Sequence, residues 1–154
     1  MPTMVNDMPT MVKKCKILMY ADDTVLFYGD KDSTAIQDVL TNEADRVASW
    51  IRENNLALNL KKGKTDFVLY GSHQKLSRMS KCEITINNSV INESSAYCYL
   101  GVTLDNHLTL QEHVNNVYRK CSARVKLLSR VRQNMVPYIA STIYTTMIRP
   151  ITLY

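Results

Sequence analysis

Residues 17–28 read ILMYADDTVLFY, two apolar runs separated by a polar break. The apolar run from Ile17 stops at Ala21, and β-branched and aromatic residues resume from Thr24 to Tyr28. Two short apolar runs on either side of a polar break are typical of two strands joined by a turn. The stretch therefore predicts a β-hairpin, which the following Gly29 brings to an end.

Two adjacent carboxylates, Asp22 and Asp23, fall at the predicted tip of this hairpin. Like charges so close destabilise each other unless a cation neutralises them. Mg²⁺ takes oxygen ligands and keeps several waters, so a pair of Asp side chains with substrate phosphates suits it. Because neighbouring strand residues point to opposite faces, only one of the two is expected to be a primary ligand. The alternative for an Asp-Asp pair taken alone is a solvated turn.

A long helix is predicted after the hairpin. Thr34 and Gln37 have the spacing of a capping box, and apolar residues follow at helical intervals to about Glu53: Ile36, Leu40, Ala44, Val47 and Ile51. Short extended runs are predicted further on, with a turn at Asn87-Asn88. These runs are 56–60, 67–70, 83–86, 90–91 and 97–103.

The last third of the sequence predicts two helices. The first carries an apolar stripe made of Leu110, Val114, Val117, Cys121, Val125, Leu128 and Val131. A second helix is expected to begin at Pro137, with a face formed by Ala140, Ile143, Tyr144 and Met147. Pro150 is expected to end or kink it. Apolar residues continue to the last position, so we expect a chain that is truncated at its C-terminus.

Charge is divided along the chain of 154 residues, which is long enough for one modest domain or two small subdomains. The formal net charge is +5, but residues 22–53 hold eight acidic and three basic residues, whereas residues 104–154 hold seven basic and two acidic. One end can gather cations while the other meets phosphates. The alternative is two solvated helices of opposite charge.

Several classes of protein are excluded. The four cysteines form no C-x-x-C pair, which argues against a zinc module or disulfide framework and favours a reducing compartment. No apolar run approaches the roughly 20 residues that cross a bilayer. The N-terminus has no charged segment followed by an apolar core, so no signal peptide is predicted. An intracellular location, cytoplasmic or nuclear, with no membrane partner, is expected.

Several motifs together resemble the reverse transcriptase of non-LTR (LINE-type) retrotransposons. The strongest is the Tyr-Ala-Asp-Asp of residues 20–23 between apolar half-strands, which resembles that family's metal-binding hairpin. Four weaker motifs accompany it in the family's order: 5–9 (VNDMP), 55–59 (NLALN) leading into Lys64-Thr65, 99–105 (YLGVTLD), and 148–150 (IRP). The resemblance covers nearly the whole chain.

The resemblance implies an α+β fold. Residues 1–107 would form a partial reverse-transcriptase palm, with antiparallel β hairpins and one long helix, and residues 108–154 a small helical thumb. The implied activity is RNA-directed DNA polymerisation by two-metal nucleotidyl transfer. The implied cofactor is Mg²⁺, with Mn²⁺ as an alternative. The implied partners are an RNA template, a DNA primer and deoxynucleoside triphosphates.

The resemblance also implies roles for particular residues. Asp22 and Asp23 would hold the metal, and Lys64 would assist the leaving pyrophosphate as a general acid, with Lys61 and Lys62 as competing candidates. The turn at Tyr99, Leu100 and Gly101 would be primer-grip-like. Nucleic-acid backbone contacts would come from Arg119, Lys120, Arg124, Lys126, Arg130 and Arg132. The alternative for these lysines and arginines is ordinary surface charge.

The sequence also departs from this family. The family's further metal-binding Asp on an earlier palm strand, and its fingers, have no counterpart here, and Asp7 does not fit that role because its setting matches the linker before the hairpin. We therefore expect this chain to be a fragment that is inactive as an isolated protein. The alternatives are a non-catalytic nucleic-acid-binding module and a non-functional relic of a mobile element.

Overall fold

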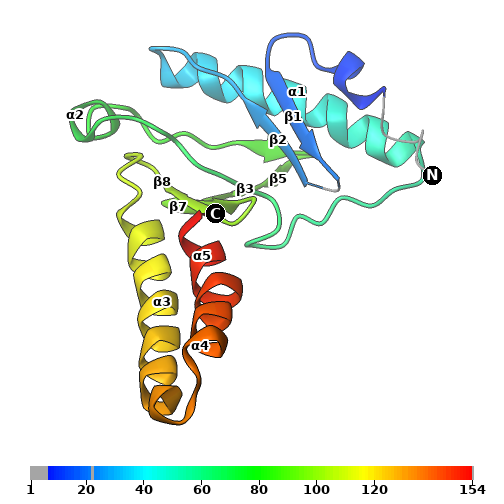
Figure 1. The fold of residues 1–154 in the computed structure, drawn as a ribbon. Coiled ribbons are helices and arrows are strands. Elements are labelled where there is room, and N and C mark those ends of the chain that lie inside the picture. The colour runs from blue at the N-terminus through cyan, green and yellow to red at the C-terminus, as the bar shows by residue number, and fades with distance from the viewer. Residues whose placement is uncertain (1–6, 22, 154) are drawn as a thin grey trace. The chain divides into compact units, whose positions relative to one another are not determined.

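The structure, a computed structural model, describes residues 7–21 and 23–153. The chain divides into two compact units, Met1–Ser94 and Ser95–Tyr154 (Figure 1). Helices and short β-hairpins occur in a mixture compatible with the expected α+β class. The division precedes the hairpin at residues 96–105, which the sequence interpretation grouped with the first domain by ending that domain at residue 107.

The first unit contains the predicted hairpin. A 3₁₀ helix, η2 (Met8–Met11), leads into β1 (Lys16–Tyr20), which pairs antiparallel with β2 (Asp23–Phe27). Three inward residues, Ile17, Met19 and Leu26, pack with Met8, Val47 and Trp50. The hairpin is thus fixed by its inner face to the helix that follows.

That helix, α1 (Ser33–Glu53), ends where the sequence predicted but is capped differently. Asp32 is the N-cap, and its carboxylate accepts hydrogen bonds from both the backbone N–H and the hydroxyl of Thr34. Gln37 does not reach back to the helix start, because its side-chain oxygen accepts from the backbone N–H of Glu83 (2.9 Å). The predicted capping box at Thr34 and Gln37 is therefore wrong.

Gln37 is the first rung of a ladder between α1 and the segment 83–87. Three polar side chains, one turn apart on α1, accept hydrogen bonds from backbone N–H groups two residues apart on that segment. The pairs are Gln37 with Glu83 (2.9 Å), Thr41 with Thr85 (3.4 Å) and Asp45 with Asn87 (2.7 Å). Four helical residues rise about 6 Å and two strand residues about 6.6 Å, so the two repeats match over this length.

The rest of the first unit is short and irregular. The strands β4 (Thr85–Ile86) and β5 (Ser89–Val90) form a hairpin with its turn at Asn87 and Asn88, as predicted, and both turn residues have left-handed backbones. Strand β3 (Asp66–Phe67) pairs parallel with β6 (Asn92–Glu93), and α2 (His73–Leu76) is a single turn that the sequence did not indicate. The run 56–60, predicted to be extended, is not part of any strand in the described chain.

The second unit is a hairpin followed by helices. Strands β7 (Ala96–Tyr99) and β8 (Val102–Asp105) pair antiparallel and precede α3 (Gln111–Val131). The 3₁₀ turn η3 (Arg132–Asn134) leads to α4 (Pro137–Ile143), the π-helix η4 (Tyr144–Ile148) and α5 (Arg149–Leu153). Figure 1 shows α3 running antiparallel beside this second helical run.

Pro150 does not end the second helical run, which continues to Leu153, and a π turn directly precedes the residues around this proline. Proline lacks an N–H and its ring crowds the carbonyl one turn earlier, which a wider turn accommodates. The extra residue rotates the face that follows. Ile148 is buried at 4% exposure, whereas Tyr144 (50%) and Met147 (49%), both predicted for the inner face, are exposed.

The apolar stripe predicted for α3 is only partly covered. Val117, Cys121 and Leu128 are half-buried, whereas Val114 and Val125 are 55% and 48% exposed. Leu110 is not within the helix but is its N-cap, with φ 58°. Among the described residues of the second unit, Ile148 alone is buried.

Candidate metal site and nucleic-acid interface

The hairpin tip is a two-residue turn between β1 and β2. Tyr20 lies opposite Asp23 in the register, so the two strands are paired up to the tip. Ala21 has φ 53°, the left-handed backbone that tight hairpin turns require. Asp22, one of the two expected metal ligands, lies outside the described residues. The structure therefore places one of the pair, Asp23.

Asp23 lies on the outer face of the hairpin. Side chains alternate along a strand, and Leu26, on the same strand, packs inward against the core. Asp23 therefore shares its face with Tyr20 and Phe27, which are 63% and 43% exposed. This arrangement holds a carboxylate at the start of a strand, open to solvent, while the opposite face is fixed against α1.

An exposed carboxylate fits the oxygen preference of Mg²⁺, which is commonly held by one or two carboxylates together with waters and phosphates. The fit is limited by the number of ligands. Within residues 7–21 and 23–153, no group of three or more His, Cys, Asp or Glu side chains is arranged to hold a metal ion. Asp23 could thus supply part of a coordination shell, the rest coming from Asp22, water or bound phosphate.

A buried carboxylate anchors the segment that leads into the hairpin. Glu43 on α1 is 1% exposed, accepts a hydrogen bond from the backbone N–H of Lys13 (2.6 Å) and pairs with Arg46 (2.9 Å). Burial and the charge of Glu43 raise the pKa of the Cys15 thiol to about 11. Sequence reasoning missed Glu43, although an acidic residue beside Ala44 on an apolar helix face was a usable signal.

Asp7 also helps to hold the segment before the hairpin against α1, and it does not contribute to the hairpin tip. One of its carboxylate oxygens accepts a hydrogen bond from the indole N–H of Trp50 (3.4 Å). Trp50 itself is 4% exposed and belongs to the core of the first unit. Asp7 thus has a structural partner, in agreement with the interpretation that it is not a metal ligand.

The candidate triphosphate lysines lie on a tightly bonded loop of the first unit. Lys61, Lys62 and Lys64 are all exposed. The loop is closed by a hydrogen bond from the Gly63 backbone N–H to a carboxylate oxygen of Asp66 (2.9 Å), and Gly63 has φ +80°. The other Asp66 oxygen is buried and has no hydrogen-bond partner among the described residues. The loop presents all three lysines alike, so the choice among them stays open.

The primer-grip-like residues form the turn between β7 and β8 in the second unit. Tyr99 pairs with Val102, and Leu100 and Gly101 make the turn with φ 47° and 86°. Positive φ at both central residues is the geometry of a two-residue hairpin, and glycine adopts it readily. Leucine does not, so Leu100 is held in a costly backbone conformation.

Asp105, just after this hairpin, has a structural role that the motif did not indicate. Its carboxylate accepts hydrogen bonds from the Thr109 backbone N–H and hydroxyl (both 3.0 Å) and from the Leu110 N–H (2.7 Å). The pKa of Asp105 lies below its ordinary value, chiefly because of the hydrogen bond from the Thr109 backbone N–H. In the same region the Thr103 backbone N–H donates to Nδ1 of His113 (3.3 Å), so His113 joins β8 to α3.

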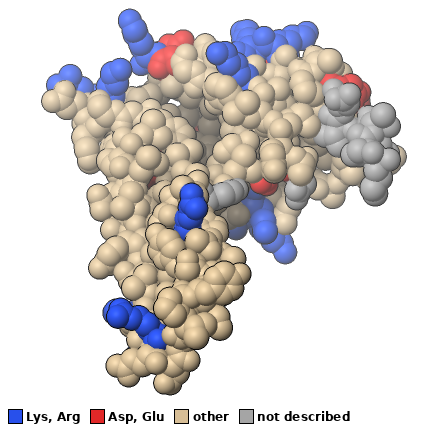
Figure 2. All heavy atoms as spheres, viewed as in Figure 1, with Lys and Arg blue, Asp and Glu red and all other residues tan. Residues whose placement is uncertain are grey.

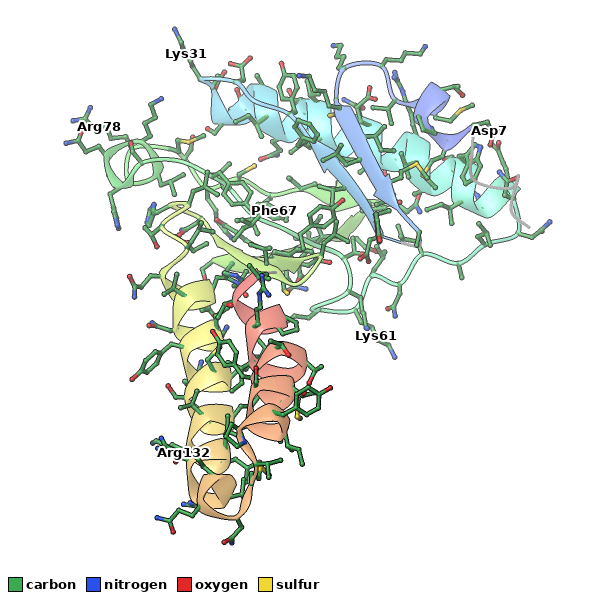
Figure 3. All side chains as sticks on the ribbon, viewed as in Figure 1. Asp7, Lys31, Lys61, Phe67, Arg78 and Arg132 are labelled. Carbon is green, nitrogen blue, oxygen red and sulfur yellow. The ribbon has the colours of Figure 1, made fainter. Side chains whose placement is uncertain are left out.

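The six basic candidates of the last third do not share one face. Arg119, Lys126 and Arg130 follow intervals of seven and four residues, which bring them to one side of α3. Arg124 lies about 160–200° from Lys126 around the helix, and its guanidinium donates to the backbone carbonyl of Met147 in the π turn. Lys120, four residues before Arg124, lies on the Arg124 side of α3, and Arg132 lies past the end of α3 in η3 (Figure 3).

The sequence matches the RNA-directed DNA polymerase of the mobile element jockey of Drosophila melanogaster, at 27% identity over 161 residues that cover 97% of this chain. This chain is similar to the polymerases of non-LTR mobile elements. It is also 28% identical over 92% of its length to the probable polymerase of transposon BS, and 27% identical over 78% to that of the transposon X-element, both of Drosophila melanogaster. These polymerase relatives confirm the resemblance that the motifs indicated.

The chain spans 17% of the jockey polymerase, 16% of the BS polymerase and 13% of the X-element polymerase. No protein-family profile matches it, and no solved structure does. No helix in the described part of the chain is long and apolar enough to cross a membrane. The palm and thumb assignments, like the roles of the individual site residues, stay predictions.

Proposed function

We propose that this chain is part of an RNA-directed DNA polymerase and carries a metal-binding hairpin of its active site. The observation that carries the proposal is the tight β1–β2 hairpin, whose inner face packs on α1 while Asp23 stands on the exposed face. The same chain is similar over 97% of its length to the jockey polymerase. Together these two facts support this function over others that an exposed Asp could serve.

Asp22 and Asp23 would hold Mg²⁺, or Mn²⁺ in its place. When bound, the ions supply charge that stabilises the attacking and leaving oxygens of phosphoryl transfer. The protein's own contribution is to hold the carboxylates on a short, well-anchored turn, so that they need little reorganisation when a triphosphate arrives. The partners would be an RNA template, a DNA primer and deoxynucleoside triphosphates.

Two further groups would act on the substrates. Lys64, or its neighbours Lys61 and Lys62, would donate a proton to the leaving pyrophosphate. The turn at Tyr99, Leu100 and Gly101 would contact the primer. Since the chain spans 17% of the jockey polymerase, these groups would act within a larger protein, and we propose that the chain alone does not extend a primer.

Metal titration tests the proposal. Two carboxylates without a third protein ligand should bind Mg²⁺ or Mn²⁺ weakly, with a Kd of about 1 mM, or roughly −4 kcal/mol. Calorimetry should show this binding in the intact chain and its weakening in both Asp22→Asn and Asp23→Asn, with the greater loss in the variant that removes the primary ligand. Asp38→Asn is the matched control, because Asp38 is an exposed carboxylate on α1.

The outcomes separate the parts of the proposal. Equal binding by Asp23→Asn and the intact chain would remove the metal site. Micromolar affinity would show that a further ligand exists within the chain. Primer extension on a poly(A) template, present in the intact chain and abolished by Asp22→Ala, would overturn the proposed inactivity but support the site.

A second function, non-catalytic binding of nucleic acid, is favoured by one observation. The outer side of α3 carries Arg119, Lys126 and Arg130, all exposed, and α3 has no acidic residue after Glu112. Cations gathered on one side of a helix can follow a phosphate backbone without reading base sequence. This function is compatible with the first and would survive the loss of the metal site.

A further inference from the structure

A second basic surface lies in the first unit, far from α3 in the sequence. The segment 71–82 holds His73, Lys75, Arg78 and Lys81 and no acidic residue. All four basic side chains are exposed, whereas the two large apolar residues of the segment, Leu76 and Met79, are half-buried. The segment is therefore two-sided, with its charge outward. We call it the basic loop.

Contacts on both sides hold the basic loop in place. Leu76 lies against Gly71, where an added Cβ would come within 3.0 Å of the leucine side chain. Ser72 caps α2 by accepting a hydrogen bond from the Lys75 backbone N–H. At the far end, the Ser80 hydroxyl lies 3.0 Å from that of Ser33 at the start of α1. A loop fixed in this way needs little ordering before it binds a partner.

The charge at the centre of the loop is not balanced locally. Lys81 forms a salt bridge with Glu83 (2.7 Å), which offsets one cation. Within the described residues, neither Lys75 nor Arg78 forms a salt bridge. Figure 2 shows blue side chains at the α2 end of the first unit as well as along its upper edge, and Figure 3 shows Arg78 and Lys31 projecting from the α2 end. Asp30 and Asp32 flank Lys31, so the unopposed charge is centred on α2.

We propose that the basic loop binds the phosphate backbone of RNA. Cores of protein interfaces are apolar and aromatic, whereas this surface offers cations with serine hydroxyls and turns its apolar residues inward. Those are the donors that contact phosphates without reading bases. The choice of RNA among polyanions rests on the proposed polymerase function. Binding by the loop itself rests only on its charge and its fixed geometry.

Fluorescence anisotropy with a labelled 20-nucleotide single-stranded RNA tests the proposal on the full chain. The test variant is Lys75→Gln with Arg78→Gln. The matched control is Lys13→Gln with Lys14→Gln, which removes the same charge from exposed lysines of the same unit. All four side chains are exposed, and circular dichroism would verify that both variants keep their helices.

The basic-loop variant should weaken RNA binding several-fold and reduce the log–log salt slope by about 1.4, from roughly 0.7 per lost phosphate contact on a single strand. The control should change the slope by less than half as much. Equal effects of the two pairs, or no effect of the test pair, would overturn the proposal. Competition by poly-glutamate as effective per charge as RNA would instead assign the loop to acidic proteins.

The result is independent of the metal titration. Loss of RNA binding in the loop variant with Mg²⁺ binding unchanged supports both proposals. An unaffected slope with normal Mg²⁺ binding removes only the basic loop. If the basic-loop variant loses RNA binding as expected but Asp23→Asn leaves metal binding unchanged, only the metal-site proposal is removed.

Discussion

At the scale of single residues, several side chains in recognisable motifs turn out to hold the backbone. Asp105 belongs to a motif that resembles a primer-contacting hairpin, yet its carboxylate accepts three hydrogen bonds from the loop before α3. Arg124, a candidate for phosphate contact, donates to a carbonyl of its own unit. A motif predicts which residue types occur together. It does not reveal which of them are occupied in holding the loop.

The Asp105 hydrogen bonds predict a dependence of stability on pH. Because the folded pKa lies below the unfolded one, the carboxylate stabilises the fold above the unfolded pKa, and this contribution is lost as pH falls through the folded pKa. Asp105→Asn should therefore be less stable than the intact chain at pH 7, and the difference should shrink towards pH 2–3, about the acidic range of carboxyl groups. Urea unfolding at both pH values measures it. A difference independent of pH would contradict the assignment.

Substitution of Leu100 should stabilise the fold, in contrast to substitution of Asp105. A leucine with φ 47° is strained, and asparagine adopts this backbone more easily. Leu100→Asn should raise the free energy of unfolding by about 0.5–1 kcal/mol, whereas Gly101→Ala, at φ 86°, should lower it. Thermal unfolding of both variants provides the comparison. A destabilised Leu100→Asn would show that the half-buried leucine side chain contributes more than its backbone costs.

At the scale of elements, the sequence predicted those with a clear period and missed those made by distant contacts. The β1–β2 hairpin, α1 and α3 follow from apolar spacing and were predicted with nearly their observed bounds. The cap of α1 was not predicted correctly, because the Gln37 side chain accepts a hydrogen bond from Glu83, a residue 46 positions later. The rotated face at Tyr144–Ile148 was missed because a single π turn leaves no repeat in the sequence. Asp22, the residue on which most depended, lies outside the described residues.

The two sides of α3 can be told apart by salt dependence. Replacing Arg119 and Lys126 by Gln should reduce the log–log salt slope for duplex DNA by up to about two units, at roughly 0.9 per phosphate, for every sequence alike. Arg124→Gln should alter this slope less and lower the melting temperature, because its partner is the Met147 carbonyl. Anisotropy titrations between about 50 and 200 mM salt suffice. Equal slope changes per charge removed in the two variants would show that the helix binds with no preferred side.

At the scale of the whole molecule, burial is unevenly divided. In the described part of the chain, twelve of the thirteen buried residues belong to the first unit, and Ile148 is the thirteenth. Cooperative protection from exchange depends on buried contacts. The two units should therefore differ in how readily they open.

Hydrogen exchange measures this difference directly. Backbone amides in the middle of α1, around Val47 and Ala48, which are 7% and 3% exposed, should exchange much more slowly than those in the middle of α3. Both helices have 21 residues, so length does not account for the difference. Similar protection of α1 and α3 would contradict it, and would indicate that α3 is covered by another surface, such as a second copy of the chain.

The ladder between α1 and residues 83–87 makes the first unit sensitive to length more than to composition. Any acceptor that reaches the strand can replace Gln37, Thr41 or Asp45, so substitutions at these positions are individually mild. A single-residue deletion between two rungs acts differently, because it turns the helix by about 100° or moves the strand's N–H groups to its other edge. Every rung beyond the deletion is then lost together. The first unit should therefore tolerate many substitutions along α1 and residues 83–87, whereas deletion of a single residue there should unfold it.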